Sequence, residues 1–306
     1  PYGARESWRV GFMGMIDRIW KTIESRNTTF RYQEGFVQRE INAYDEKSIR
    51  EAVTNAFVHR DYSVQGNSII IKASPDKFYI ENPGMFMKGV TVENIMEKSV
   101  YRNRLLAESL EKINVMERSS QGVDTIFMRA IEDGKGRPSY HVTTDPSIQL
   151  TIPAKLVDED FVRFFEDAIN KRGASLSARE IVELEMIRTG ERRTDLQFKD
   201  KFIELGLIEK YGRGRGQKFI LSHKYYSVSG RAGEHTRITG LSRDMRRATI
   251  LQHLKNNKGV TSKELQDAMP DMKDTEISSL LKGMKKDGLI EYVGTGPRWG
   301  YWKLKA

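Results

Sequence analysis

Three polar side chains with complementary chemistry recur four residues apart in the segment Arg50–Ser63. Glu51, Asn55 and His59 would lie on one face of a helix, because residues four apart in a helix are neighbours on its surface. A carboxylate there can accept a proton from water, and an amide oxygen one turn away can bind Mg²⁺. An ordinary solvated helix face has the same appearance, so the spacing alone leaves both interpretations open.

The elements that would position these side chains can be read from periodicity and turn residues. Apolar residues recur at helical spacing through residues 48–59, which predicts a helix. Two short strands are expected after it, Asn67–Ala73 and Phe78–Glu81, separated by the turn sequence Ser-Pro-Asp-Lys. The other elements expected within residues 1–155 are helices at Thr91–Lys98, Arg104–Ile113 and Gly122–Ile131 and a strand near Ile148–Ile152. Helices over a mixed sheet, an α+β arrangement, are therefore predicted here.

Four sequence blocks occur in a fixed order between residues 50 and 127. They read REAVTNAFVHRDYS (50–63), YIENPG (79–84), SVYRNRLLAESL (99–110) and MERSSQGVDTIF (116–127). Together they resemble the divergent ATP-binding domains of the gyrase, heat-shock chaperone, histidine kinase and mismatch-repair (GHKL) superfamily. The particular branch is the "ATP-dependent DNA helicase C-terminal-like" one, whose members commonly follow an AlbA/Schlafen-type DNA-binding domain. The resemblance covers about residues 40–130 and implies a GHKL-like (Bergerat-type) α/β sandwich with ATP and Mg²⁺ as cofactors.

The resemblance also implies roles for individual residues. Glu51 corresponds to the family's water-activating carboxylate, and Asn55 to the amide that binds Mg²⁺ together with the nucleotide. Asn82 stands where more active relatives have an aspartate that receives the adenine amino group. The residues expected to bind the nucleotide are Asn55, His59, Asn82, Gly84, Arg102, Asn103 and Gly122.

Two departures from the family pattern weaken the case for hydrolysis. Asn82 keeps one carbonyl acceptor but no charge, so its bond to an amine is weaker than that of a carboxylate. The block Ser119–Gly122 has one glycine where phosphate-binding loops usually offer two or more, which restricts close approach of the backbone. Nucleotide binding is therefore a stronger expectation than turnover.

The composition excludes several other classes of chemistry. The sequence has no cysteine, which rules out a disulfide scaffold, a thiol nucleophile, a zinc ribbon and an iron–sulfur site. It has no P-loop lysine motif, no Ser–His–Asp arrangement and no apolar run near the ~20 residues of a membrane helix. A cytoplasmic protein without membrane contact is expected. Because the sequence begins with Pro1, a further N-terminal module is expected to precede it.

The second half of the chain repeats one plan twice, at residues 156–228 and 241–306. Each copy has three helices, a glycine, and the sequence Gly-Leu-Ile-Glu opening a hairpin, which is the order of a winged helix. Residues 229–240 are expected to be a linker, within the polar stretch Ser222–Gly240. The predicted helices are Val157–Lys171, Ser177–Arg188, Thr194–Leu205, Arg243–Asn256, Thr261–Ala268 and Asp274–Lys286.

The positive charge of the chain is concentrated in this half. The net charge is +9, of which residues 1–155 contribute +2 and residues 156–306 contribute +7. A local excess of this kind is what a surface that meets a polyanion requires, although a solvated basic linker or a protein-binding winged helix would also produce it. The residues expected to contact DNA are Arg213, Arg215, Lys218, Lys273, Ser278, Lys282, Lys285 and Arg298.

These expectations combine into a DNA-binding transcriptional regulator, in which nucleotide binding or dimerisation of the first domain positions winged helices on double-stranded DNA. A homodimer is expected, because relatives in the superfamily often dimerise through this domain. Two alternatives stay open at this point. One is a DNA-stimulated, Mg²⁺-dependent ATPase of a nucleic-acid-processing or defence system. The other is a pseudo-ATPase scaffold whose winged helices bind protein.

Overall fold

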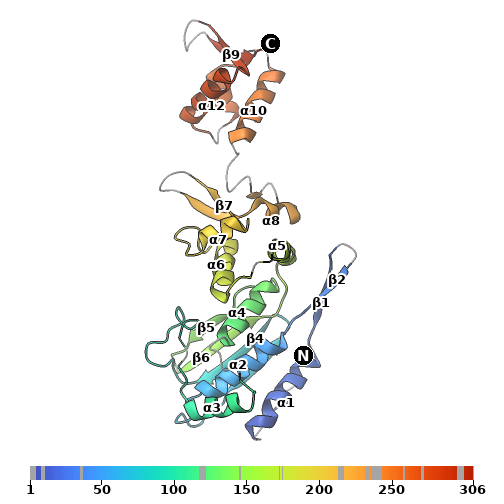
Figure 1. The fold of residues 1–306 in the computed structure, drawn as a ribbon, viewed down its shortest axis with the longest axis vertical. Helices are drawn as coiled ribbons and strands as arrows, with labels where there is room; N and C mark the ends of the chain where they lie inside the picture. Colours follow the sequence, from blue (N-terminus) through green and yellow to red (C-terminus); the bar gives the residue numbers. More distant parts are fainter. Residues whose placement is uncertain are drawn as a thin grey trace. The chain divides into compact units, whose positions relative to one another are not determined.

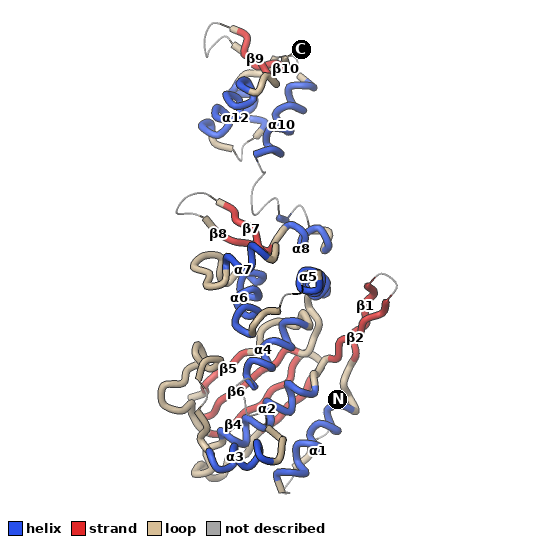
Figure 2. Tube along the Cα trace, viewed as in Figure 1, coloured by secondary structure: helices blue, strands red, loops and turns tan. Residues whose placement is uncertain are grey.

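The computed structural model divides into two compact units, Pro1–Ser229 and Gly230–Ala306 (Figures 1 and 2). It describes residues 5–7, 11–34, 37–98, 100–116, 122–144, 146–171, 173, 175–212, 217–231, 234–235, 243–257, 259–269, 272–294 and 300–305. Within these ranges, no helix is both long enough and apolar enough to cross a membrane.

A four-stranded sheet lies at the centre of the first unit. Its order is β3-β4-β6-β5, and its bounds are Ile70–Ser74, Lys77–Pro83, Ser147–Pro153 and Ser139–Val142 respectively. Each of these pairs is antiparallel, so the prediction of a mixed sheet was wrong for the described strands. The reason is local: β3 joins β4, and β5 joins β6, through turns too short for a parallel crossover.

Helices cover one face of this sheet (Figure 1). They are α1 (Phe12–Glu24), α2 (Glu46–His59), α3 (Arg104–Lys112) and α4 (Gly122–Glu132), of which α2 packs on β4 and α4 on β6. The Asp45 carboxylate caps α2 by accepting from the Ser48 N–H at 2.9 Å. The shared core is formed by alternate residues of the strands and the inner faces of the helices: Ala52, Val53, Ala56, Phe78, Ile80, Ile126, Ala130, Leu150 and Ile152.

An N-terminal hairpin of β1 (Thr29–Glu34) and β2 (Val37–Asn42) was not predicted. Tyr32 and Ile41 bury their side chains against Val162 of α5 (Glu159–Asn170), which anchors the hairpin to the following part of the unit. This contact depends on residues more than 100 positions apart, so no local pattern in the sequence indicates it.

The rest of the first unit consists of α5, α6 (Ala178–Thr189), α7 (Lys199–Glu204), the antiparallel hairpin β7 (Ile208–Tyr211) and β8 (Lys218–Leu221), and α8 (His223–Val228). A capping box begins α6, because Ser177 and Glu180 satisfy each other's backbone N–H groups. Helix α6 also packs against α4, which ties this part to the sheet-bearing part.

Helix α7 is shorter than the predicted Thr194–Leu205. The Glu183 carboxylate accepts the backbone N–H groups of Gln197 and Phe198, each at 2.8 Å. Asp195 has a φ of +53°, which no helix accommodates. The helix therefore begins only at Lys199, directly after the two residues whose N–H groups Glu183 binds.

Helix α8 occupies the start of the polar stretch Ser222–Gly240, in which no helix was predicted. Ser222 caps this helix, and Tyr225 and Tyr226 are buried. The Tyr225 hydroxyl donates to Asp158 at 2.6 Å, which fastens the helix to the beginning of α5. Polar composition was therefore a poor guide here, because two aromatic residues in it are part of the core.

The second unit contains α10 (Arg243–Asn256), α11 (Ser262–Ala268), α12 (Asp274–Lys286) and the antiparallel hairpin β9 (Ile290–Val293) and β10 (Tyr301–Leu304). A capping box of Thr261 and Glu264 is present at the start of α11. The core of this unit is formed by Ile250, Leu254, Leu265, Ile277, Leu281, Met284 and Ile290.

Candidate functional site

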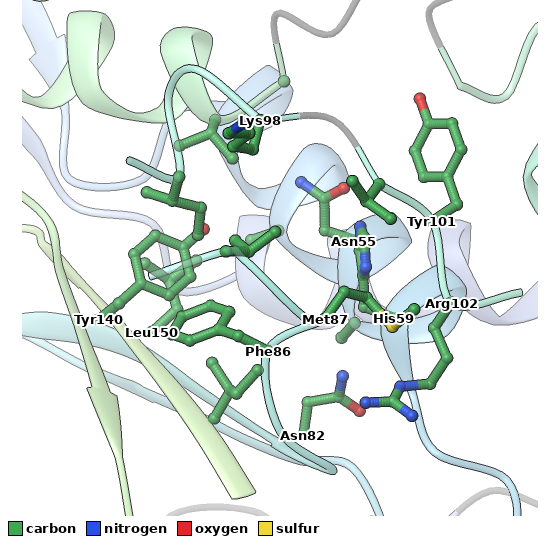
Figure 3. Close-up of a pocket in the computed structure, with 18 of the residues that line it drawn as sticks. Asn55, His59, Asn82, Phe86, Met87, Lys98, Tyr101, Arg102, Tyr140 and Leu150 are labelled. Atoms are coloured by element: carbon green, nitrogen blue, oxygen red, sulfur yellow. The ribbon is translucent and has the colours of Figure 1, made fainter. Parts of the chain in front are cut away.

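A cavity lies between α2 and the sheet in the first unit (Figure 3). Its volume is about 960 Å³ when the part open to solvent is included. Its walls come from α2, the start of α4, strands β4, β5 and β6, and residues 84–103, which we call the 84–103 segment and which connect β4 to α3. A cavity that combines many apolar walls with a few polar groups is typical of small-molecule sites.

The polar side chains of α2 line this cavity. Glu51, Asn55 and His59 all face it, while Val53 on the opposite side of the helix is buried in the core. The Asn55 amide Nδ2 donates to Glu51 Oε1 at 3.0 Å. This bond turns the Asn55 Oδ1 atom away from Glu51, and within the described residues that oxygen has no hydrogen-bond donor. A hard cation such as Mg²⁺ takes such an oxygen as a ligand.

Gly122, the first residue of α4, contacts the Glu51 carboxylate. A Cβ atom at Gly122 would lie 1.6 Å from Glu51 Oε1 and 2.3 Å from its Cδ atom. Glu51 therefore fills the space that a side chain at this position would need, and only glycine lets the carboxylate lie there. The rest of the predicted glycine-bearing block, residues 119–121, lies outside the described residues.

Asn82 presents an unpaired acceptor to the cavity. It lies near the end of β4, only 7% exposed, on the same side of the strand as Phe78 and Ile80. Its Oδ1 atom is buried and has no hydrogen-bond partner among the described residues. A buried polar atom without a hydrogen bond lowers the stability of a protein by about 1–3 kcal/mol. A ligand that donates a hydrogen bond to the Asn82 oxygen would remove this penalty.

Arg102 closes the same side of the cavity as Asn82, and Figure 3 shows the two side chains pointing toward one another. Its guanidinium contacts Asp61 Oδ2 at 3.2 Å and donates to the Met85 carbonyl at 2.8 Å. Burial and the Arg102 charge together lower the pKa of His59 to about 4. His59 is therefore a neutral imidazole near pH 7.

Two predicted nucleotide-binding residues do not line the cavity. Gly84 has a φ of +122°, and a Cβ there would lie 3.0 Å from the Asp61 Cβ atom. The Asn103 amide donates to the carbonyls of Val58 and Arg60, at 2.9 and 2.8 Å, and so closes the end of α2. These residues contact elements that form the cavity walls, and their contact with a nucleotide stays a prediction.

Several cavity residues were absent from the sequence-based set, notably Lys98 and Tyr140. Lys98 lies in a region predicted as a helix, Thr91–Lys98, where the structure has only turns stabilised by the Asn94 side chain. Tyr140 belongs to β5, a strand the sequence did not indicate, and burial and the nearby Glu51 raise its pKa. The remaining unpredicted wall residues are mostly apolar, including Met85, Phe86, Met87, Val90, Tyr101 and Ile148.

No group of three or more His, Asp or Glu side chains in the described part of the chain could hold a metal ion. A Mg²⁺ ion beside Asn55 would therefore need most of its oxygen ligands from phosphate groups and water.

The residues predicted to contact DNA lie in both units. Lys218 is exposed at the start of β8. Lys273, Ser278, Lys282 and Lys285 are exposed on or beside α12, whose other face is buried in the core of the second unit. Arg213, Arg215 and Arg298 lie outside the described residues.

Comparison with known proteins finds a family and a solved structure that this chain resembles. Residues 66–152 match a family described as "Putative ATP-dependent DNA helicase recG C-terminal". The chain also resembles the crystal structure of the DIP2311 protein from Corynebacterium diphtheriae, with 14% identity, a TM-score of 0.54, and coverage of 95% of this chain and 54% of that chain. This likeness concerns the fold alone, and the present chain spans about half the length of that protein. No curated protein matches the sequence significantly.

The matched family accounts for the central part of the cavity-bearing region. Asn82, Arg102 and Gly122 lie within the matched residues, whereas Glu51, Asn55 and His59 precede them. The match indicates nucleotide binding, as the sequence resemblance implied. Residues 66–152 therefore resemble a divergent ATPase-like domain.

Proposed function

We propose that this chain is a nucleotide-responsive, DNA-binding transcriptional regulator. In this proposal the cavity binds an adenine nucleotide, a homodimer forms through the first unit, and the two sets of helices and hairpin act as winged helices on double-stranded DNA. The observation that carries the nucleotide part is the buried, unpaired Asn82 Oδ1 atom on the cavity wall.

An adenine ring fits the chemistry around Asn82. The cavity wall between Asn82 and Asn55 is largely apolar, with Phe86, Met87 and Leu150 available to contact the faces of a planar ring. The exocyclic amino group of adenine is a donor, which is what the Asn82 oxygen lacks. An amide acceptor makes a weaker bond than a carboxylate would, so moderate affinity is expected.

The wall formed by Glu51 and Asn55 suits the phosphates and their metal. Asn55 Oδ1 would be one ligand of a Mg²⁺ ion, which when bound would neutralise phosphate charge. Glu51 holds the Asn55 amide in the orientation that offers this oxygen. The same carboxylate supports a second candidate function, ATP hydrolysis, because it could accept a proton from water in the cavity.

The DNA part of the proposal rests on the exposed face of α12. Ser278, Lys282 and Lys285 lie three and four residues apart, so they share one face of the helix. None of these side chains makes an ion pair or hydrogen bond with another described residue, so they are available to phosphates. Helices of this kind read the major groove, and lysines beside them contact the backbone.

The nucleotide part is tested by titrating Mg-ATP into the purified chain and into Asn82→Ala, followed by calorimetry. Asn67→Ala, an exposed asparagine outside the cavity, is the matched control. We expect Asn82→Ala to lose about tenfold in affinity, the equivalent of one hydrogen bond of about 1.4 kcal/mol, while Asn67→Ala binds like the wild type. Equal affinities in all three proteins would contradict the assignment of Asn82.

The DNA part is tested by measuring duplex binding over a range of salt concentrations. A Lys282→Gln/Lys285→Gln variant should bind more weakly, and the slope of log affinity against log salt should fall by about 2. Lys255→Gln, an exposed lysine on α10, is the control and should leave both quantities nearly unchanged. Duplex binding that does not depend on salt would contradict this part of the proposal.

A further inference from the structure

The charges on the cavity wall are unevenly neutralised. Four charged or basic side chains line it within the described residues: Glu51, His59, Lys98 and Arg102. Arg102 is paired with Asp61, and His59 is neutral near pH 7 because its pKa is about 4. Lys98 makes no ion pair or hydrogen bond through its ammonium with any other described residue. It is therefore the lining cation whose charge is left available to a ligand.

Lys98 and Asn82 lie on opposite sides of the cavity. Figure 3 shows Lys98 on the side toward Asn55, well separated from Asn82 and Arg102. Phe86 and Leu150 lie between these two groups in the same view. The cavity thus offers an unpaired acceptor at one side, apolar walls in the middle, and an unpaired cation at the other. A nucleotide has this same order of chemistry: a base with a donor, flat ring faces, and phosphates.

We propose that Lys98 binds the phosphate groups of a nucleotide whose base contacts Asn82, so that the cavity selects adenosine di- and triphosphates over adenosine. This inference rests on the proposed nucleotide function and adds a residue and a ligand preference to it. A lysine ammonium is a compact charge on a flexible stem with three donors, which suits phosphate oxygens whose positions vary with the number of phosphates.

A cation is needed on that side of the cavity, because Glu51 also lines it and repels phosphate. Lys98 offsets the Glu51 charge without forming an ion pair that would have to break. Its exposed side chain lies on the 84–103 segment, whose turns at residues 92–97 carry it to the rim of the cavity. The ammonium can therefore reach phosphates that extend toward solvent.

The test compares the full chain with three variants in calorimetric titrations with adenosine, ADP and ATP. Lys98→Met removes the charge and keeps the stem, and Lys98→Arg keeps the charge. Lys88→Met makes the same charge change on the same segment at an exposed lysine that does not line the cavity. We expect Lys98→Met to bind ADP and ATP about tenfold more weakly, the usual effect of losing a charge-assisted bond, and to bind adenosine as the wild type does.

The other two variants distinguish a direct contact between Lys98 and phosphate from a general effect of the positive charge of the segment. Lys98→Arg should retain most of the preference for ATP over adenosine, and Lys88→Met should retain all of it. Unchanged ADP and ATP affinity in Lys98→Met, with a wild type that binds both, would overturn the role of Lys98 and leave the nucleotide site standing. Weakened binding of adenosine as well would also overturn it, because the effect would then not lie at the phosphates. A wild type that binds none of the three ligands would overturn both proposals.

Discussion

The depressed pKa of His59 predicts that the first unit loses stability in mild acid. The unfolded chain takes up a proton at this residue below pH 6.5, whereas the folded chain takes it up only near pH 4. The unfolded state therefore binds more protons between these values, and the unfolding free energy falls as the pH falls. The contribution of neutral His59 to the free energy of unfolding is fully present above pH 6.5. Integrating the difference gives a loss of about 2 kcal/mol by pH 5 and about 3 kcal/mol by pH 4.

Amide hydrogen exchange in α2, followed by mass spectrometry from pH 4.5 to 7.5 and corrected for intrinsic exchange rates, measures this effect where it arises. His59→Gln removes the titrating group, so its protection should change less with pH than that of the wild type. His141→Gln changes an exposed histidine on β5 and serves as the matched control. If the wild type and His59→Gln lose protection in parallel down to pH 4.5, the reasoning about His59 is wrong.

Three further predictions follow from particular contacts. Gly122→Ala should displace the Glu51 carboxylate and weaken Mg-ATP binding by about tenfold in calorimetry. The free energy of unfolding should change by less than about 1 kcal/mol, because the added Cβ clashes with a movable side chain. An unchanged affinity for Mg-ATP would contradict this prediction. Asp158→Ala should lower the free energy of unfolding of the first unit by about 3 kcal/mol in urea titrations. The reason is that this largely buried carboxylate pairs with Arg188, accepts from the Tyr225 hydroxyl and caps α5. A loss below about 1 kcal/mol would contradict this prediction. Thr261→Ala should destabilise the second unit by about 1 kcal/mol, because it removes the capping box of α11. Thr275→Ala, at an exposed site on α12, is the control, and an equal loss of stability in this variant would argue against capping as the cause.

Helices with a clear apolar stripe and a local start signal could be predicted from the sequence. Helix α12 has the predicted bounds, and α6 begins at the capping box that Ser177 and Glu180 form. These features depend on residues within a turn or two of each other, which the sequence displays directly. The stripe of Glu51 and Asn55 on α2 was found for the same reason.

Some of the differences between the predictions and the structure come from contacts between distant parts of the chain. Helix α7 starts late because Glu183, from a neighbouring helix, takes the N–H groups that would have begun it earlier. Lys98 reaches the cavity on turns in a region predicted as a helix, and Tyr140 reaches it on a strand that is too short to show a pattern. Asn103 was predicted to bind the nucleotide, and the structure shows in addition that its amide donates to carbonyls at the end of α2. Sequence spacing identifies a polar residue near a site and does not say which way its side chain points.

The proposed function depends most on the binding of an adenine nucleotide at Asn82 in the cavity beside α2. A crystal structure of the chain with Mg²⁺ and a non-hydrolysable ATP analogue tests this directly. We expect the adenine amino group to lie within about 3 Å of Asn82 Oδ1 and the phosphates to lie on the side of Asn55 and Lys98. An analogue bound elsewhere, or a cavity filled only by water at saturating ligand, would contradict it.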